Sequence, residues 1–581
     1  MIRTLLKSVR EYRKQTITTP ILVVIEAAIE TLIPFLMAMI IDRGINAGNM
    51  TIVIRVGVLL LIMAVLSLMM GAGASWISSI AAAGFAKNLR QDLFYHIQTF
   101  SFQNLDQFPT SSLVTRLTTD ITNLQTAFQM AIRIAFRAPS MLIFSIIMAF
   151  TVSSEMASLF VVAIPILAIG LWLIVRYSRP LFRQVFQRYD RLNRVVRENL
   201  RGIRVVKTYG QQAAEISKFK AASGSIFKTF SKAQRIVALN MPVMQFVINT
   251  TMLLLSWYGA HLIVGNQLQV GQLVSLFSYS MSILFSLNML SMIFSQLSVA
   301  QASAERVIAV MQTKPSITDD DQALNTVTNG EVVFEHVSMQ YPGTHTPQLK
   351  DVNLRIKSGS MVGIIGETGS AKSTLVELIP RLYDVSEGRV LVAGHDVRDY
   401  DLKALRDNVA MVLQNTMLFS GTIAENLRWG NADATDEQLQ TAAKMAQADE
   451  FVQSLPQKYD TYIEQNGQNI SGGQRQRLTI ARALLKQPQI LILDDSTSAT
   501  DTRTDAAIRA AFKTQLLNVT KLMITQRITS VQEADEIIVM QAGQVAAVGT
   551  HAELLATNDW YKQLADSQEK QGGDAHAGLT Q

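Results

Sequence analysis

The stretch Gly366-Glu-Thr-Gly-Ser-Ala-Lys-Ser-Thr374 decides the fold of the second half of this chain. It follows MVGII, an apolar run that predicts a buried strand, and it leads into STLVELIP, which predicts a helix. A loop in that context is a P-loop, whose successive backbone N–H groups wrap a phosphate at a helix N-terminus. Lys372 is then expected to reach the β- and γ-phosphates of a nucleotide, and Ser373 to offer its hydroxyl to Mg²⁺.

One position of this loop departs from the usual pattern, because Ala371 stands where a second glycine is normal. Alanine is tolerated there if the backbone keeps a negative φ, and the sequence does not decide whether Ala371 weakens nucleotide binding. The loop residues predicted to bind nucleotide are Gly366, Glu367, Thr368, Gly369, Ser370, Ala371, Lys372, Ser373 and Thr374.

Further along the chain, Ile490-Leu-Ile-Leu-Asp494 predicts a second buried strand, and this one ends in an acid. Four apolar residues followed by an acid form the Walker B arrangement, in which Asp494 holds Mg²⁺ through water. Such a strand is common by itself. Together with a P-loop it indicates a nucleotide-binding α/β domain.

A third motif, Ser471-Gly-Gly-Gln474, lies before a predicted helix and shortly before the Walker B strand. This sequence at this place resembles the signature of ATP-binding cassette (ABC) transporters. The resemblance implies that ATP and Mg²⁺ are the cofactors and that the signature acts on the ATP of a second cassette. The residues that would do so are Ser471, Gly472, Gly473 and Gln474.

The same resemblance assigns further residues of the second half. Tyr341 looks like the aromatic residue that stacks on adenine, and Gln414 like the Q-loop glutamine, a third Mg²⁺ contact beside Ser373 and Asp494. Asp501 would end the D-loop, and Gly467 would close the X-loop.

The first half is unlike the second in charge and in hydropathy. Residues 1–312 hold 28 of the 52 Lys and Arg residues but only 12 of the 46 Asp and Glu residues. Apolar runs without charge, such as Val56–Ala86, are long enough for the ~20 residues that cross a bilayer. Six membrane-spanning helices are predicted, near 16–41, 55–83, 130–153, 157–178, 238–263 and 271–297.

Basic residues set the expected orientation. They crowd the N-terminus and the segment 176–235, and none lies in the third-to-fourth or fifth-to-sixth connection. The positive-inside rule therefore places the N-terminus and the ATP-binding domain in the cytoplasm of a multi-pass cell-membrane protein, next to membrane lipids. A nucleic-acid partner is excluded because the basic residues flank apolar spans without base-stacking aromatics. With no cysteine, the chain has no disulfide and no thiolate chemistry.

The order of these parts is that of an ABC exporter half-transporter of the type IV fold. The segments around Leu105-Asp106 and Val206–Tyr209 resemble the coupling helices of such exporters. The fold class is thus a helical membrane domain of six spans followed by an α/β P-loop cassette. We expect a membrane domain at 1–312, a linker at 313–330, the cassette at 331–568 and a disordered tail at 569–581.

Two catalytic positions of the cassette depart from the family. Asp495 stands where a glutamate activates water, and Gln526 where a histidine contacts the γ-phosphate. Asp is one methylene too short for hydrogen-bond reach, and an amide cannot become a cation. Gln465 also replaces a common X-loop glutamate, whereas the signature is nearly intact, with Ile470 for its usual first leucine.

Two catalytic residues beside the chain's own nucleotide thus depart from the family, whereas the signature that would act on a second cassette is kept. This combination indicates a subunit of a heterodimer. The chain resembles the degenerate-site subunit of a heterodimeric bacterial multidrug exporter, whose partner is a second ABC half-transporter and whose cargo is hydrophobic or amphipathic compounds. A dedicated lipid or peptide exporter and an ATP-gated regulatory channel stay open as alternatives.

Two acids lie inside the first predicted span. Glu26 and Glu30 are four residues apart and share a helix face. They are candidates for a substrate-facing site, or for a pair that is solvated or bonded to a neighbouring helix. The residues alone do not decide between these two interpretations.

Overall fold

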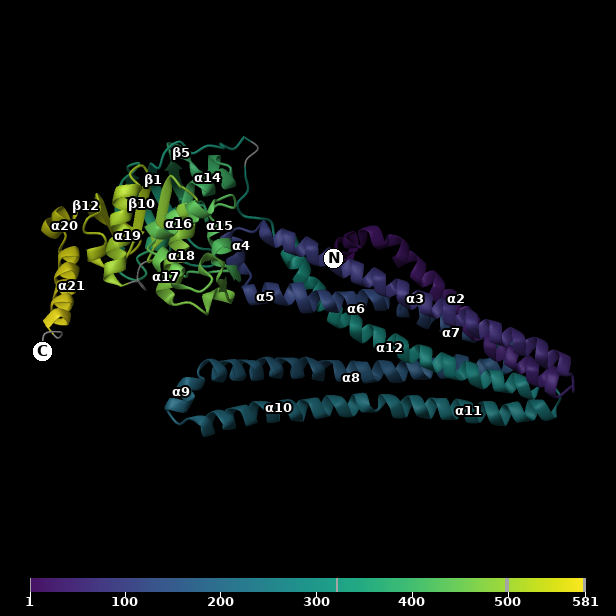
Figure 1. Ribbon diagram of the computed structural model, residues 1–581. Coiled ribbons are helices and arrows are strands. Elements are labelled where there is room, and N and C mark those ends of the chain that lie inside the picture. Colours follow the sequence, from purple (N-terminus) through teal and green to yellow (C-terminus); the bar gives the residue numbers. More distant parts are fainter. Residues whose placement is uncertain (1, 320–321, 497–500, 578–581) are drawn as a thin grey trace. The chain divides into compact units, whose positions relative to one another are not determined.

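The computed structural model describes residues 2–319, 322–496 and 501–577 (Figure 1). The chain forms two compact units. The membrane unit comprises Met1–Gln98 and Ser111–Thr313, and the cassette unit comprises Thr99–Thr110 and Lys314–Gln581. The expected boundary at residue 312 is close to the division at Thr313, but it omits the short segment Thr99–Thr110, which belongs to the cassette unit.

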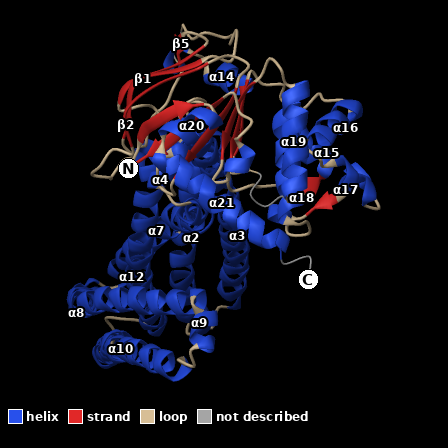
Figure 2. Cartoon of the chain, turned by 90° about the vertical axis from the view of Figure 1, so that its left-hand side faces the viewer, coloured by secondary structure: helices blue, strands red, loops and turns tan. Residues whose placement is uncertain are grey.

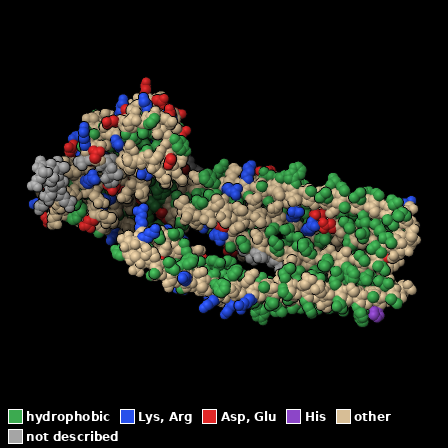
Figure 3. Space-filling model, turned by 60° about the horizontal axis from the view of Figure 1, so that its bottom comes forward, with side chains coloured by type: hydrophobic (Ala, Val, Ile, Leu, Met, Phe, Trp, Pro, Cys, Tyr) green, Lys and Arg blue, Asp and Glu red, His purple; other side chains and the backbone are tan. Residues whose placement is uncertain are grey.

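The membrane unit is built from long helices. Among the residues that the structure describes, six helical segments are long and apolar enough to cross a membrane, in agreement with the six predicted spans. Hydrophobic side chains cover these helices on the face shown in Figure 3, where a soluble protein would carry mixed polar residues. The helices are α1 Ile2–Leu6, α2 Arg13–Met39, α3 Met50–Gln98, α5 Thr110–Thr115, α6 Ile121–Ile132, α7 Ile134–Val152, α8 Ser154–Arg201, α9 Ile203–Thr208, α10 Gln212–Ala238, α11 Asn240–Val264 and α12 Val270–Gln312.

Within this unit, α2 packs on α3 and α7, and α12 packs on α7, while α8 lies along α10 and α11. Polar groups tie these helices together inside the apolar layer. The hydroxyl of Tyr279 on α12 donates to the carbonyl of Thr31 on α2 at 2.9 Å, fully buried. Asp42 accepts hydrogen bonds from the backbone N–H groups of Gly271 and Gln272, which satisfies unpaired donors in the first turn of α12.

The cassette unit contains a six-stranded sheet in the order β12-β11-β3-β10-β9-β6 and a four-stranded sheet in the order β2-β1-β4-β5, with a small β7-β8 pair. Figure 2 shows the strands in red, with α15–α18 gathered to one side of the two larger sheets. The strands are β1 Val332–Met339, β2 Leu349–Ile356, β3 Met361–Gly366, β4 Glu387–Val392, β5 His395–Asp396, β6 Val409–Val412, β7 Gly421–Thr422, β8 Tyr462–Ile463, β9 Ile490–Asp494, β10 Thr520–Ile524, β11 Glu536–Gln541 and β12 Gln544–Gly549.

The central strands β3, β10 and β9 are parallel and fully buried, as expected for a sheet covered on both faces. Ile524 pairs with Ile364 on one side and with Asp494 on the other, so the carboxyl ends of the three strands meet at one edge. The helices of this unit are α4 Phe102–Gln107, α13 Lys372–Glu377, α14 Leu402–Asn408, α15 Ile423–Arg428, α16 Asp436–Met445, α17 Asp449–Ser454, α18 Gly472–Leu485, α19 Thr502–Gln515, α20 His551–Thr557 and α21 Asp559–Ala577.

The end of the chain differs from the sequence expectation. A disordered tail was predicted from residue 569, but α21 extends past this residue and ends at Ala577. The helix forms because its first half packs on the cassette core, where Tyr561 and Ala565 are buried four residues apart.

Candidate functional site: the nucleotide site of the cassette

The P-loop joins β3, which ends at Gly366, to α13, which begins at Lys372. The Lys372 ammonium donates to the carbonyls of Gly366 at 2.9 Å and Glu367 at 2.7 Å, and to the Ser370 hydroxyl at 3.3 Å. Burial lowers the pKa of Lys372, while the nearby carboxylates of Asp494 and Asp495 act in the opposite direction. The cation is therefore held within the loop that would wrap the phosphates.

Ala371 adopts the left-handed conformation, with φ 70° and ψ 25°. The condition for an unstrained alanine, a negative φ, is therefore not met. The backbone at this position makes a turn that glycine adopts freely. Because alanine carries a methyl group, this conformation costs roughly 1–2 kcal/mol. The sequence departure is thus a strained position.

The predicted Mg²⁺ contacts come together at the ends of β3 and β9. The Ser373 hydroxyl bonds to the Asp494 carboxylate, and the Gln414 amide bonds to the Asp495 carboxylate. Burial is the main cause that raises the pKa of both acids. A hydroxyl, an amide oxygen and one or two carboxylates suit Mg²⁺, which takes its other ligands from phosphate and water. These residues therefore fit the ion that the P-loop chemistry requires.

The two departing catalytic residues lie at the same sheet edge. The Asp495 N–H donates to the carbonyl of Ile524 at 3.0 Å, which fixes the backbone of β9's end against β10. Gln526 follows β10 by two residues, and its side chain is exposed. The register thus brings Asp495 and Gln526 to the edge that carries the P-loop, as their proposed roles require.

Tyr341 lies beside the P-loop helix and is linked to α4. Its hydroxyl shares a hydrogen bond of 3.1 Å with the Thr374 hydroxyl and donates to the Glu377 carboxylate at 3.2 Å. Burial raises the pKa of Tyr341 to about 12. Its ring meets that of Tyr383 edge-on, with centroids 5.0 Å apart, and the Tyr383 hydroxyl donates to Asp106 on α4 at 2.9 Å. An aromatic pair therefore connects the predicted adenine position with α4.

The signature lies at the start of α18, on the helical part of the cassette. Ser471 caps the helix: its hydroxyl accepts from the Gln474 N–H at 3.3 Å, and the Gln474 side chain accepts from the Ser471 N–H at 2.9 Å. Ser471 and Gly472 are exposed at the surface. Arg475 donates to the carbonyl of Asn466 at 2.7 Å, which ties the signature helix to the X-loop segment around Gln465.

Asp501 caps α19 through a hydrogen bond from the Thr504 N–H at 2.8 Å. That bond is the main cause that lowers the pKa of Asp501. The preceding D-loop residues 498–500 lie outside the described residues.

In the membrane unit, Glu26 and Glu30 are both paired with Arg137 of α7. One Arg137 nitrogen contacts Glu26, and the other donates to the Glu30 carboxylate at 2.9 and 2.8 Å. Glu26 is 5% exposed, next to Gly71, where any side chain would collide with its carboxylate. These are the contacts of the second interpretation, a pair bonded to a neighbouring helix. The missed signal was a basic residue inside the predicted span 130–153.

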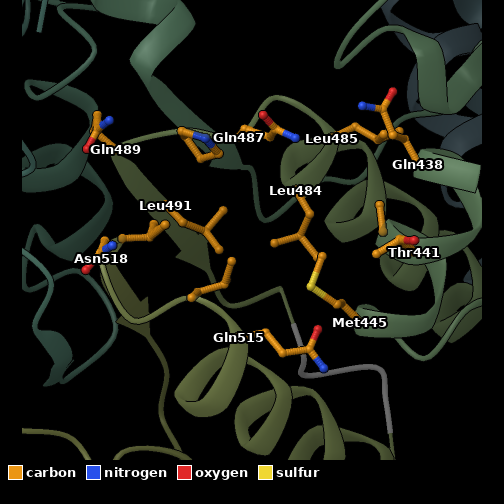
Figure 4. Close-up of a pocket in the computed structure, with 14 residues that line it drawn as sticks. Gln438, Thr441, Met445, Leu484, Leu485, Gln487, Gln489, Leu491, Gln515 and Asn518 are labelled. Carbon is orange, nitrogen blue, oxygen red and sulfur yellow. The ribbon is translucent and has the colours of Figure 1, made fainter. Parts of the chain in front are cut away.

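A separate pocket of about 510 Å³ lies elsewhere in the cassette, between α16, the end of α18 and the strand β9 (Figure 4). Its wall combines apolar residues such as Leu484 and Met445 with amides such as Gln438 and Asn518. It carries no Lys, Arg, Asp or Glu, so it lacks what phosphates and Mg²⁺ need.

Comparisons with known proteins show the family of the chain. Residues 16–287 match the family description "ABC transporter transmembrane region", and residues 349–498 match "ABC transporter". An uncharacterized ABC transporter ATP-binding protein of Bacillus subtilis, YfiB, is 36% identical over 94% of this chain and 95% of its own length. An ATP-dependent lipid A-core flippase of Yersinia pestis is 31% identical over 97% of both chains.

The fold also matches a solved structure, described as a bacterial Atm1-family ABC exporter with ATP bound. The TM-score is 0.80 at 22% identity, over 96% of this chain and 98% of the other. The chain therefore belongs to the ABC transporter family. It is an exporter half-transporter, a multi-pass membrane protein with one ATP-hydrolysing cassette.

Proposed function

We propose that this chain is the degenerate-site subunit of a heterodimeric exporter that moves hydrophobic or amphipathic compounds across the bacterial cell membrane. In this proposal the N-terminus and the cassette face the cytoplasm, as the basic residues near the spans favour. The single observation that carries the heterodimer is that Asp495 and Gln526 both replace the usual catalytic residues at one edge of the sheet, while the signature is nearly intact.

Both departures affect the same chemical step. A general base must reach the attacking water within hydrogen-bond distance, and Asp495 is a methylene short of the usual glutamate. Gln526 can bond to a γ-phosphate oxygen but supplies no positive charge. This chain's Lys372, Ser373 and Asp494 would therefore bind ATP with Mg²⁺ that is hydrolysed slowly or not at all.

The signature motif is expected to act on the ATP of a partner subunit. Ser471 and Gly472 are exposed at the start of a capped helix of 14 residues, where backbone N–H groups favour a phosphate. In an ABC dimer they would complete the competent site of the second subunit. A homodimer would carry two weakened sites and no competent one.

The predicted second coupling helix supports a partner as well. No residue of α9 is buried, and the apolar side chains of Val205 and Tyr209 are 59% and 73% exposed. Exposed apolar residues at a helical turn mark an interaction surface. We assign them to the partner's cassette, whereas α4 belongs to the cassette unit of its own chain.

Transport would follow from alternating access. Two ATP molecules close the cassettes, α4 and α9 pass that closure to the spans, and hydrolysis at the competent site reopens them. The Tyr341–Tyr383–Asp106 connection supports a role for α4 in this step.

A lipid cargo is the second candidate. It is favoured by the similarity to the lipid A-core flippase, which covers nearly the whole chain. Stimulation of the ATPase by added amphipathic drugs, compared with stimulation by lipids in the same vesicles, separates the two cargos. Absence of stimulation by either would favour a regulatory gate.

The heterodimer is tested by paired substitutions in the complex with the subunit encoded next to this chain. Asp495→Asn here should slow turnover only modestly, because this site contributes little hydrolysis. Replacing the partner's Walker B glutamate with glutamine should abolish turnover. Similar losses from both changes would contradict the assignment.

A further inference from the structure

The membrane unit has a second feature that nucleotide hydrolysis does not use. A pocket of about 550 Å³ lies between α8 and α11, which is within the size range of small-molecule sites. Because α8 begins at Ser154, Glu155 places the pocket beside the α7–α8 connection, at one end of the spans. It is lined by Glu155, Ser158, Leu159, Leu254, Trp257 and Tyr258.

The lining joins one carboxylate to two aromatic rings. The Tyr258 hydroxyl donates to Glu155 at 3.3 Å, which holds the carboxylate beside the rings. The Trp257 indole is 62% exposed. Its other neighbour is His261, whose ring centroid lies 5.1 Å away and whose Nδ1 pairs with the Trp257 carbonyl at 3.0 Å. The indole is thus positioned by its own helix.

Among the residues that line the pocket, Glu155 is the one charged side chain, and its charge is negative. Glu155 is the one charged residue between Arg137 and Arg176, and no Lys, Arg, Asp or Glu lies between Arg235 and Glu305. No basic side chain among the lining residues competes for the carboxylate. An aromatic face attracts a cation through its quadrupole, and the combination of such faces with an anion is the arrangement that recognises alkylammonium groups.

We infer that this pocket binds the alkylammonium head of an organic cation, with Glu155 supplying the charge, Trp257 and Tyr258 the aromatic faces, and Leu159 and Leu254 the apolar wall. A free cation and a lipid headgroup present the same alkylammonium chemistry, and the experiment below separates these two sources. Aromatic residues also anchor helices at a membrane surface, but an anchor does not distinguish a cation from its neutral isostere. The inference is independent of the proposed heterodimer.

Trp257 makes the pocket directly observable, because it lines the pocket and is one of five tryptophans in the chain. The full-length chain is labelled with 5-fluorotryptophan and placed in phosphatidylglycerol nanodiscs, and the ¹⁹F resonance of Trp257 is assigned with Trp257→Phe. Choline should shift this resonance saturably, and the uncharged isostere 3,3-dimethylbutan-1-ol should not. Trp172, exposed but with Arg176 over its ring at 5.5 Å, is the internal control and should not respond.

Glu155→Gln should weaken choline binding by about ten-fold or more, because the amide keeps the shape but loses the charge. Unchanged resonances from the other four tryptophans show that this variant is folded. Equal shifts by choline and its isostere, or unchanged choline affinity in Glu155→Gln, would overturn the inference.

The source of the cation is separated by repeating the titration in phosphatidylcholine nanodiscs. If the lipid headgroup fills the pocket, the Trp257 resonance begins at its shifted position and added choline has no further effect. If a free cation is the ligand, the titration is the same in both lipids. ATPase activity is measured in parallel, so a failure here is distinguishable from a failure of the proposed heterodimer.

Discussion

At the scale of single residues, the nucleotide site contains a few positions where the residue type or the backbone conformation departs from the usual pattern. Ala371 and Asp495 both have a positive φ, 70° and 47°, in a region that L-residues enter at a cost. Gln526 follows the end of β10 by two residues. The motifs predicted all three positions, but only the backbone revealed the strain at Ala371, because a pattern of letters carries no dihedral angle.

Ala371→Gly should stabilise the cassette by about 1 kcal/mol, since glycine adopts φ 70° without a clash of its own Cβ. Thermal unfolding and ATP affinity, measured on the same preparations, check this. The control is Ala506→Gly, an exposed site within α19, which should destabilise by about 1 kcal/mol. A loss of stability in both variants would show that the P-loop position is relaxed with alanine.

At the scale of elements, α21 stabilises the switch loop, the segment Gln526–Ile528 that follows β10. The Gln568 side chain accepts from the Ile528 N–H at 2.9 Å and donates to the Gln526 carbonyl at 2.7 Å. At the start of the helix, the Trp560 indole donates to Glu367 of the P-loop at 3.2 Å. One helix thus contacts both loops of the catalytic edge. No local pattern predicts these contacts, because they join residues that are far apart in the sequence.

Gln568→Ala should loosen the switch loop, because it removes both backbone hydrogen bonds, each worth about 0.5–1.5 kcal/mol. Amide hydrogen exchange at Ile528 should become faster, while exchange in β9 stays the same. Gln563→Ala, an exposed change on the same helix, is the control. Unchanged exchange at Ile528 would mean that α21 does not hold this loop.

At the scale of the whole molecule, the order of parts was predictable and their physical connections were not. The six apolar runs and the P-loop chemistry give two domains, because lipid and phosphate impose strong constraints on composition and spacing. The assignment of Thr99–Thr110 to the cassette unit depends on tertiary contacts such as Tyr383 with Asp106, which no local pattern encodes. The same holds for Arg137 as the partner of Glu26 and Glu30.

Arg137→Met should destabilise the membrane unit by about 3–5 kcal/mol, because it leaves two carboxylates uncompensated among apolar helices. Adding Glu26→Gln and Glu30→Gln should restore most of that stability, as neutral amides need no counterion. Arg133→Met is the matched control, since Arg133 donates only to the neutral Ser75 hydroxyl at 3.2 Å within the contacts described. Thermal unfolding in detergent gives the ranking, and a triple variant no more stable than Arg137→Met would exclude charge as the cause.

The most direct test of the degenerate site is the burst of phosphate released when the heterodimer, purified with the subunit encoded beside this chain, meets excess Mg·ATP. Rapid-quench measurement separates this first turnover from the steady state. If this chain's site hydrolyses poorly, the burst approaches one phosphate per heterodimer, and Asp495→Glu together with Gln526→His raises it toward two. A burst of two phosphates per unmodified heterodimer, released at equal rates, would contradict the account.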